Sequence, residues 1–451
     1  MNQKIEKIRS KFAHMPGRPN RLFIVGGAVR DSFMGVKPKD VDFVCVGTVE
    51  DIIEMFGHAE AIHPHAPVFG VKFDDEAFEV ALAREEISTG AGSEAFEFKP
   101  AASIVADLVR RDFTVNAIAV DVFNGIVHDP FDGRGDIMTM SLHPVGPRFA
   151  ESAERVGRAA MMIARFNFKP TRGLEQVCRS MIAEFAAIPP EQMWKQFFGK
   201  MLEKGKHFVA AFEFMQDCGA LAVFPELVAM RNCKQDPRHH PEGDVLTHTL
   251  LTMEVAARFS QSDMLTIVST MLVHDMGKPA VTVINEDGSV TAHGHEDEHG
   301  AILSFMERIH FPHALRQNVL TLVSCHMRKN NIPNNRSRAR LLRKLTDGDA
   351  TAQQFADVIF ADCNGRGAGQ FSFLPVDAIR FVDFAQNFKP AEASKQARPL
   401  IDGSDLIAAG FKPGRVFTAM LDAVQEAFLA GEISTPEEAL EVAKEVHNAA
   451  S

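Results

Sequence analysis

Two aspartates that flank a single valine are the first residues in the chain with chemistry suited to phosphoryl transfer. Asp40 and Asp42 lie at the start of a predicted strand over 41–46 (VDFVCV), and strand residues two apart share one face of a sheet. Two carboxylates on one face repel each other unless a cation lies between them. The pair therefore indicates a site for two Mg²⁺ ions that hold the attacking and leaving oxygens of a phosphoryl transfer. A solvated strand that happens to carry two acids is the alternative.

Glycines and arginines on either side of this pair could bind a triphosphate. The run GGAVRD (26–31) leads from a predicted strand over 21–25 into a helix, and its glycines allow the backbone to approach a phosphate closely. Arg30 would add a fixed cation, although a plain strand–turn–helix explains the same run. Farther along, RRDFTVNA (110–117) places two arginines beside a carboxylate and an amide.

Histidines and aspartates suited to metal binding recur in the second half of the chain. The runs HHPEGDVLTH, VHDMGK, HGHEDEHG, SCHMRK and FADCNGRG follow one another and supply His248, His274 with Asp275, either His295 or His299, His326 and Asp362. Such side chains on different helices can converge on a divalent cation, whose bound water then attacks a phosphoester. A degenerate helical domain that keeps these residues for packing is the alternative.

Hydrophobic periodicity separates a mixed first part from a helical remainder. Further strands are predicted over 68–73 and 77–82, and Thr48 with Asp51 forms a capping box for a helix over 49–56. Beyond about residue 150 the pattern is helical. These elements would place both aspartates on a small sheet and the histidines among helices.

Composition restricts the class of protein. The chain has 451 residues, 46% hydrophobic and 24% charged, as in a soluble globular protein. It has no apolar run long enough for a membrane helix and no secretory signal, so we expect a cytoplasmic protein without a membrane partner. Six dispersed cysteines without a C-x-x-C pair argue against a disulfide scaffold.

The net charge and one basic run bear on nucleic-acid binding in opposite ways. A net charge of −11 argues against a protein that coats nucleic acid over its whole surface. The stretch 328–344 nevertheless contains seven Arg or Lys residues and no acid. It is either a local RNA-binding groove or a solvated loop and helix face.

The motifs of the first part, taken in order, carry a resemblance to a known family. GGAVRD, KDVDFV, RRDFTVNAI and DPFDGRGD resemble the class II tRNA nucleotidyltransferases, the CCA-adding enzymes of the DNA polymerase beta-type superfamily. The resemblance implies that Asp40 and Asp42 hold Mg²⁺ and that Gly27, Arg30 and Arg111 contact the incoming nucleotide. Glu79, in FEVALAR, is a candidate third carboxylate facing the metals, with a strand-edge acid as the alternative.

The resemblance weakens where the family reads the nucleotide base. In the family a helix after the head carries E-D-x-x-R, whose second acid and arginine recognise the edge of C or A. Here Arg155 and Arg158 match family arginines, but Ser152 stands where the family has aspartate. A serine hydroxyl is short, uncharged and both donor and acceptor. Either Glu151 or Glu154 could substitute, or selectivity is reduced.

The histidine runs resemble the HD phosphohydrolase domain found at the C-terminus of long bacterial CCA-adding enzymes. By that resemblance the metal ligands are His248, His274, Asp275 and Asp362, the metal is Ni²⁺, Mn²⁺, a similar transition ion or Mg²⁺, and Lys278 contacts phosphate. The activities implied are phosphatase, 2′-nucleotidase and 2′,3′-cyclic phosphodiesterase.

The resemblance implies an α+β protein with a polymerase-beta-like nucleotidyltransferase head, a mixed sheet with helices. An all-α neck and body and an all-α HD domain follow. We expect the head at 1–145, the neck and body at 146–231, the HD domain at 232–385 and a helical tail at 386–451. The implied partners are tRNA, ATP and CTP, and a homodimer is compatible with them. The alternatives are a poly(A) polymerase and a tRNA-binding phosphohydrolase whose transferase head has lost nucleotide selectivity.

Overall fold

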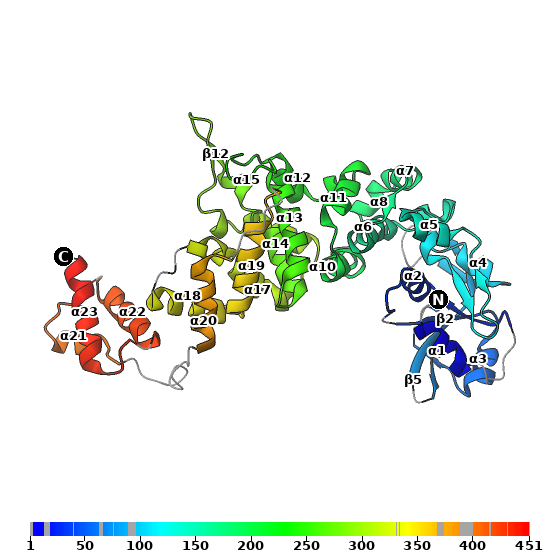
Figure 1. The fold of residues 1–451 in the computed structure, drawn as a ribbon, viewed down its shortest axis with the longest axis horizontal. Coiled ribbons are helices and arrows are strands. Elements are labelled where there is room, and N and C mark those ends of the chain that lie inside the picture. The colour runs from blue at the N-terminus through cyan, green and yellow to red at the C-terminus, as the bar shows by residue number, and fades with distance from the viewer. Residues whose placement is uncertain are drawn as a thin grey trace. The chain divides into compact units, whose positions relative to one another are not determined.

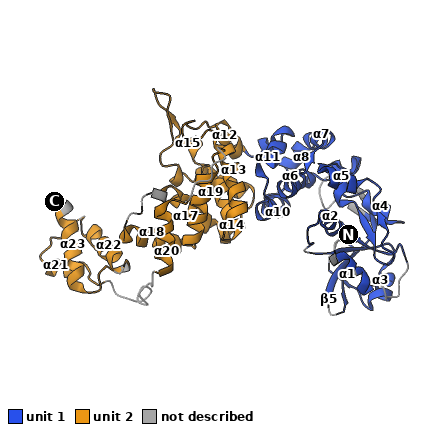
Figure 2. Ribbon diagram, viewed as in Figure 1, with its two compact units in different colours: residues 1–224 blue, residues 225–451 orange. Residues whose placement is uncertain are grey.

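The chain forms two compact units, Met1–Phe224 and Pro225–Ser451 (Figure 2). The computed structural model describes residues 3–12, 19–38, 40–62, 66–74, 76–88, 96–330, 332, 334–367, 374–387, 400–414, 416–430 and 432–450. Within these ranges no helix combines the length and apolar character needed to cross a membrane. The four domain ranges expected from the sequence stay predictions.

A seven-stranded mixed sheet forms the core of the first unit (Figure 1). In spatial order its strands are β3 (Glu60–Ala61), β4 (Val68–Phe73), β5 (Glu76–Leu82), β2 (Asp42–Cys45), β1 (Leu22–Val25), β8 (Ala119–Asp121) and β9 (Val127–His128). Strands β2 and β5 pair in parallel, and the other neighbours pair antiparallel. A separate hairpin joins β6 (Arg84–Ser88) to β7 (Phe96–Pro100). The predicted mixed sheet is confirmed, and the strand predicted over 68–73 coincides with β4.

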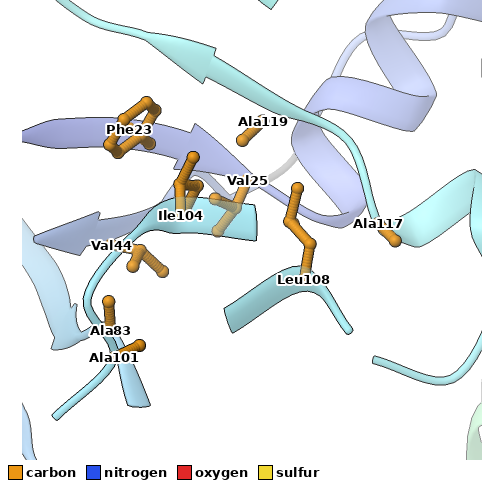
Figure 3. Close-up of a cluster of buried hydrophobic side chains, with 9 residues drawn as sticks. All are labelled: Phe23, Val25, Val44, Ala83, Ala101, Ile104, Leu108, Ala117 and Ala119. Carbon is orange, nitrogen blue, oxygen red and sulfur yellow. The ribbon is translucent and has the colours of Figure 1, made fainter. Parts of the chain in front are cut away.

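Both faces of the central strands are covered, which explains their continuous apolar character. On one face Phe12, the last residue of α1 (Gln3–Phe12), stacks on Phe73 with 4.8 Å between ring centroids and contacts Phe43 at 5.4 Å. The other face packs against α4 (Ile104–Leu108) (Figure 3). Its cluster consists of Phe23, Val25, Val44, Ala83, Ala101, Ile104, Leu108, Ala117 and Ala119.

Two helices beside the sheet begin where the sequence predicts. Helix α3 (Val49–Phe56) begins with the predicted capping box, in which Thr48 and Asp51 exchange side-chain-to-backbone hydrogen bonds. Helix α2 (Gly27–Phe33) follows β1 directly. The turn after β1 therefore brings GGAVRD to the edge where β2 begins.

The DPFDGRGD run forms a close junction between a helix and a turn. Helix α5 (Gly133–Thr139) packs on the 3₁₀ turn η1 (Thr114–Asn116) of RRDFTVNA. A Cβ on Gly133 would lie 2.2 Å from the backbone oxygen of Thr114. Two motifs distant in sequence are thereby fixed against each other, and η1 lines the cavity described below.

The rest of the first unit is helical, apart from the short parallel pair of β10 (Ser141–Leu142) and β11 (Lys169–Pro170). It contains the turn η2 (Pro147–Glu151) and helices α6 (Glu154–Phe166), α7 (Arg172–Ser180), α8 (Ile182–Ala186), α9 (Pro190–Met193), the π-helical turn η3 (Trp194–Phe198), α10 (Gly199–Lys204), α11 (Phe208–Asp217) and the turn η4 (Ala220–Val223). A Cβ on Gly157 of α6 would lie 2.8 Å from Phe197, so α6 and η3 pack unusually closely. This contact fixes the rotation of α6 about its own axis.

The second unit is also helical, except for the two-stranded hairpin β12 (Val283–Ile284) and β13 (Val290–Thr291). Its helices and turns are α12 (Pro225–Asn232), α13 (Val245–Phe259), α14 (Met264–Val273), α15 (Lys278–Val281), η5 (His295–Asp297), α16 (Gly300–Arg308), α17 (His313–Cys325), η6 (His326–Asn330), α18 (Asn335–Asp347), α19 (Ala352–Asn364), α20 (Val376–Asn387), α21 (Gly403–Ala408), α22 (Val416–Leu429) and α23 (Pro436–Ala450). The helical remainder predicted from periodicity is confirmed.

Part of the basic stretch 328–344 is engaged inside the second unit. Arg336 and Arg340 of α18 form ion pairs with Glu432 and Glu426, and Glu426 is only 8% exposed. These two arginines connect α18 to the segment around α22. The side chains of Arg336 and Arg340 remain 36% and 59% exposed, so both interpretations of the stretch stay predictions.

Replacing Gly133 with alanine should destabilise the first unit, because the new methyl group must displace the backbone of η1. Overpacking of this kind costs about 1–3 kcal/mol. Thermal and urea unfolding of Gly133→Ala would measure the loss. Gly173, in α7, is the matched control because a Cβ there meets nothing within 4 Å. Gly173→Ala should leave stability unchanged or raise it by up to about 1 kcal/mol. Equal stability of both variants would contradict the proposed tight junction.

Candidate functional site

A cavity of about 430 Å³ lies in the first unit beside the start of β2. Its wall combines the β1–α2 turn, the segment between α4 and η1, and the beginning of α6. The lining residues are Gly26, Gly27, Arg30, Asp42, Arg110, Arg111, Asp112, Asn116, Ser152, Glu154, Arg155 and Arg158. All five residues predicted to bind nucleotide line this one cavity, together with one of the predicted metal-binding aspartates.

The carboxylates predicted to bind Mg²⁺ are brought together by strand register. Phe43 pairs with Val80 in the parallel ladder, so Asp42 of β2 lies beside Glu79 of β5. Asp40 lies just before the strand rather than in it, and all three acids are exposed. Desolvation raises the pKa of Asp42, a nearby arginine opposes this, and the charges of Glu79 and Asp40 add to the rise. A divalent cation would relieve this repulsion, and carboxylate oxygens suit Mg²⁺, but these three acids do not form a group of described residues whose donor atoms all lie within 4.8 Å of one another.

Glycine is needed at position 26, one residue before the glycine that the sequence singled out. Gly26 has a φ of 68°, and a Cβ there would lie 3.0 Å from Nη1 of Arg111. A Cβ on Gly27 would make only an ordinary contact, 3.5 Å from Arg30. Arg111 pairs with Asp107 at 3.2 Å, while its Nε is buried without a hydrogen-bond partner among the described residues. The β1–α2 turn therefore passes directly beside an arginine with an unused donor.

Buried charged side chains in the cavity wall hold one another in place. Asp112 accepts hydrogen bonds from Arg158 at 2.5 Å and from Asn116 at 3.0 Å. Asn116 accepts from Arg30 at 2.5 Å, and Arg30 also pairs with Asp31 at 2.6 Å. Burial would raise the pKa of Asp112, but the charge of Arg158 and the hydrogen bonds lower it to about 2. No role was predicted from the sequence for Asp112 or Asn116, although both stand in the RRDFTVNA run.

Helix α6 begins at Glu154. The segment 151–158, which matches the family's base-recognising helix, is therefore only partly helical. Ser152 has extended backbone angles (φ −139°, ψ 113°) and precedes the helix. Arg155 donates at 2.6 Å to the backbone oxygens of Arg148 and Arg110. This guanidinium therefore fastens the start of α6 to the end of the α4 segment.

The two glutamates that could replace the missing aspartate have different surroundings. Glu151 pairs with Arg148 at 3.1 Å and does not line the cavity. Glu154 lines the cavity next to Ser152 and interacts electrostatically with Arg158 and Lys200. No rotation of α6 is needed to place Glu154 there.

In the second unit the four predicted HD ligands meet at the junction of three helices. His248 comes from α13, His274 and Asp275 follow α14, and Asp362 comes from α19. Nε2 of His248 lies 3.2 Å from Asp362 Oδ1 and 3.8 Å from Asp275 Oδ2, and Nε2 of His274 lies 3.3 Å from the same Oδ2. None of the four is more than 6% exposed. The donor atoms of His248, His274 and Asp275 lie within 4.8 Å of one another, as a divalent cation requires, and Asp362 adjoins this group at His248.

Two further histidines reach the other oxygen of Asp275. Nε2 of His295 lies 3.2 Å from Asp275 Oδ1, and Nε2 of His326 lies 3.8 Å from it. His299, the other candidate in its run, instead bonds to the backbone oxygen of Glu296 at 3.1 Å and to Ser324 at 3.2 Å. The structure thus places His295, and not His299, in this cluster.

Basic side chains surround the open side of this centre. A cavity of about 390 Å³ is lined by residues that include Asp275, Asp362, Lys278 and Arg366. Lys278 donates to Asp275 Oδ2 at 2.7 Å, and Nε of Arg366 is buried without a hydrogen-bond partner among the described residues. Arg366 was not identified from the sequence, although it lies in the FADCNGRG run that supplies Asp362.

A carboxylate outside the predicted ligand set orients His248. Glu242 Oε1 lies 2.8 Å from Nδ1 of His248 and 2.9 Å from Nδ1 of His240. Burial lowers the pKa of His248, but its bonds to Asp362 and Glu242 outweigh burial and raise that pKa to about 9. Burial and the charge of His274 lower the pKa of His326 to about 3.

Comparison with known proteins identifies relatives over most of the chain. The family profile of the poly A polymerase head domain matches residues 22–143. The chain is 31% identical over 399 residues to a multifunctional CCA protein of Acinetobacter baumannii (strain AYE), covering 82% of this chain and 93% of that protein. It is 32% identical over 415 residues to a multifunctional CCA protein of Alkalilimnicola ehrlichii, covering 89% and 95%.

Solved structures share the fold. The Bacillus stearothermophilus CCA-adding enzyme in complex with CTP matches with a TM-score of 0.61 at 20% identity, covering 95% of this chain and 93% of that chain. The Thermotoga maritima CCA-adding enzyme complexed with tRNA matches with a TM-score of 0.56 at 17% identity, covering 100% and 97%.

Replacing Asp112 with asparagine should destabilise the first unit, because Arg158 would lose its buried partner. A hydrogen bond to a charged group contributes about 1.5–3 kcal/mol, so we expect a loss of this order at pH 7. The pKa of Asp112 in the folded protein is about 2, below its ordinary 3.8. Its stabilising effect is therefore complete above about pH 4 and is lost as the pH falls toward 2.

Urea unfolding between pH 7 and pH 3 would measure the difference between Asp112→Asn and the parent chain. The gap should be constant down to pH 5 and narrow toward pH 3. Glu151→Gln is the control, because its partly exposed pair with Arg148 should contribute no more than about 1 kcal/mol. A gap for Asp112→Asn that does not change with pH would contradict the electrostatic role.

Proposed function

The chain belongs to the family of multifunctional CCA proteins, and from this membership we propose that its first unit adds the 3′-terminal CCA sequence to tRNA. The substrates would be CTP and ATP, without a nucleic-acid template. The single observation that carries the proposal is the head cavity, where the exposed carboxylate of Asp42 at the start of β2 meets an arginine-lined wall. The tRNA would contact the helical body through its phosphates and shape rather than its sequence.

The proposed reaction is an in-line displacement at the α-phosphate. The 3′-hydroxyl of the tRNA would attack, forming a new oxygen–phosphorus bond, and pyrophosphate would leave. Asp40, Asp42 and Glu79 would hold divalent cations, in this proposal Mg²⁺, which supply positive charge to the reacting oxygens when bound. Arg111 lines the cavity, where its Nη1 lies beside the bare backbone of Gly26, and its guanidinium would hold the triphosphate there.

The other predicted nucleotide-binding residues would act mainly by shaping the cavity. Arg30 is a buried residue, 5% exposed, and its guanidinium is hydrogen-bonded to Asp31 and Asn116. Arg155 holds the start of α6 through two backbone oxygens. Arg158 is held by Asp112 and lines the cavity at the start of α6, where the nucleotide base would lie in this proposal. Pre-positioned donors of this kind need no rearrangement when the nucleotide enters.

Selection of C and A would depend on Glu154 in place of the family aspartate. Both C and A present an exocyclic amine that a carboxylate can accept, whereas U and G present a carbonyl at the corresponding edge. Of the two neighbouring glutamates, Glu154 is the one that lines the cavity, while Glu151 is paired with Arg148. Ser152 would add a hydroxyl that cannot discriminate, because it both donates and accepts.

We further propose that the second unit hydrolyses phosphoesters as an HD phosphohydrolase. His248, His274, Asp275 and Asp362 would hold a divalent ion such as Ni²⁺, Mn²⁺ or Mg²⁺, which would supply a nucleophilic water when bound. Lys278 and Arg366 line the adjoining cavity and would receive the phosphate oxygens. Phosphomonoesters, 2′-nucleotides and 2′,3′-cyclic phosphates are the proposed substrates.

A poly(A) polymerase is the second candidate for the first unit, since the head profile at residues 22–143 carries that description. The relatives that cover most of the chain are multifunctional CCA proteins, which favours CCA addition. A tRNA-binding phosphohydrolase with an unselective head is favoured only by Ser152. Homodimer formation and the cytoplasmic location stay predictions.

The two proposed activities should be lost through separate substitutions. With tRNA that ends before CCA, the parent chain should incorporate C, C and A in order from labelled nucleotides. Asp42→Asn should reduce incorporation on the order of 10²- to 10³-fold or more and leave hydrolysis of a 2′,3′-cyclic nucleotide intact. His274→Ala should show the reverse pattern. Long A tails would support a poly(A) polymerase, and absence of incorporation by the parent would overturn the head proposal.

Nucleotide selectivity should respond in opposite directions to changes at positions 154 and 152. Glu154→Gln introduces a donor that U and G can use, so preference for C over U should fall by roughly 5- to 150-fold, equivalent to about 1–3 kcal/mol. Ser152→Asp adds an acceptor and should sharpen the preference. Glu151→Gln is the matched control and should change nothing. Selectivity that is unaffected by Glu154→Gln would exclude this residue as the base-edge acceptor.

A further inference from the structure

A row of lysines follows the π-helical turn η3 and helix α10 in the first unit. Its members are Lys195, Lys200 and Lys204. Lys195 and Lys200 are exposed, and Lys204 is half-buried. Lys200 and Lys204 are four residues apart in the helical part of the row, so they share one face. The ammonium of Lys204 lies 4.0 Å from the carboxylate of Glu203, which is the outer limit of an ion pair.

The π-helical turn brings Lys195 into this row. In a regular α-helix, residues five apart point in directions that differ by about 140°. Across η3 the amide of Gly199 instead donates to the carbonyl oxygen of Trp194, five residues earlier. This wider turn brings residues five apart, such as Lys195 and Lys200, toward the same side of the helix. Single π-helical turns are rare and occur frequently at functional sites.

The row adjoins the part of α6 that lines the head cavity. Lys200 interacts electrostatically with Arg158 and Glu154, and both of these residues line the cavity. The close packing of Gly157 on Phe197 fixes α6 against η3. The lysines are therefore held next to the cavity by the backbone and not only by their own flexible side chains.

Acidic groups compensate the charge of this row only in part. Burial lowers the pKa of Lys200, and the charges of Arg158 and Lys204 lower it further. The charge of Glu154 opposes this shift. The ammonium of Lys200 donates to the amide oxygen of Gln196 at 3.2 Å, and a neutral amide cannot cancel a charge. Like charges four residues apart on a helix destabilise it, so the arrangement favours a bound anion.

We propose that Lys195, Lys200 and Lys204 bind backbone phosphates of the RNA strand whose 3′ end enters the head cavity. Lysine binds phosphate as a point charge on a flexible stem. The row extends over nine residues, about 13 Å along the helix axis, which exceeds one phosphate group and suits successive phosphates of one strand. This inference rests on the nucleotidyl transfer proposed for the first unit, because that reaction brings an RNA 3′-hydroxyl to this cavity.

The triphosphate of the incoming nucleotide is the competing ligand, since it offers the same chemistry. A contact with the triphosphate would affect the binding of CTP. A contact with the RNA backbone would affect the binding of tRNA and the steepness with which that binding weakens as salt is added. A helix face that is only solvated would affect neither.

The test measures equilibrium binding of tRNA that ends before CCA to the full-length chain, by fluorescence anisotropy at several KCl concentrations, with EDTA and without nucleotide. Each lost phosphate contact reduces the slope of log affinity against log salt by about 1. The double variant Lys195→Gln, Lys200→Gln should therefore bind tRNA more weakly, with a slope reduced by about 1–2. Lys200→Arg should keep the affinity and slope of the parent. Lys72→Gln, which changes an exposed lysine of β4, is the matched control and should alter neither.

The melting temperature of the double variant separates a binding role from a structural one. Because a repulsion is removed, it should stay the same or rise. A lower melting temperature together with weaker tRNA binding would make the row structural and overturn the proposal. An unchanged salt slope in the double variant would overturn it as well.

The same variants distinguish this inference from the transfer reaction on which it rests. Weaker binding of CTP, measured with Mg²⁺, and unchanged binding of tRNA would assign the row to the triphosphate and reject the RNA contact. A parent chain that incorporates no nucleotide, but whose tRNA binding loses slope in the double variant, would overturn the proposed transfer and leave the phosphate-binding row standing.

Discussion

The buried contact between Asp112 and Arg158 is the interaction on which the head cavity depends. It connects RRDFTVNA, beside the sheet, to the first turns of α6, which line the same cavity. Asn116 extends the network to Arg30, and Arg30 to Asp31, so that a chain of hydrogen bonds crosses the cavity wall. Asp112 is buried while Arg158 is 38% exposed, so loss of Arg158 would leave a buried carboxylate without compensation. The network thereby holds the side chains of the cavity wall in one arrangement.

This network gives several residues a role different from simple ligand contact. An arginine bonded on several sides cannot also wrap around a triphosphate, and Arg30 and Arg155 are largely committed to other protein groups. Arg111 has its Nη1 beside Gly26, and its guanidinium lines the cavity. The arginines of the cavity thus include some whose guanidinium groups hold the wall together through bonds to other protein groups.

The second unit also surrounds a buried carboxylate with several partners. Asp275 lies among four imidazoles and one lysine, and burial is tolerable for it because every neighbour is cationic or able to hold a cation. These contacts outweigh burial and keep its pKa well below the ordinary value. The two centres therefore share a principle: each buried charge is stabilised by several fixed partners from distant parts of the chain.

The sequence by itself determined the mixed head, the helical remainder and the family, because strand and helix periodicity and closely spaced motifs are local properties. It also indicated both groups of candidate site residues, because the order of their motifs along the chain is typical of the family. Only the tertiary structure decided between His295 and His299, and between Glu151 and Glu154, since these choices depend on which side chain turns toward a partner far away in sequence. The commitment of Arg336 and Arg340 to glutamates almost a hundred residues away was likewise invisible locally, because ion pairs between distant helices leave no pattern in spacing.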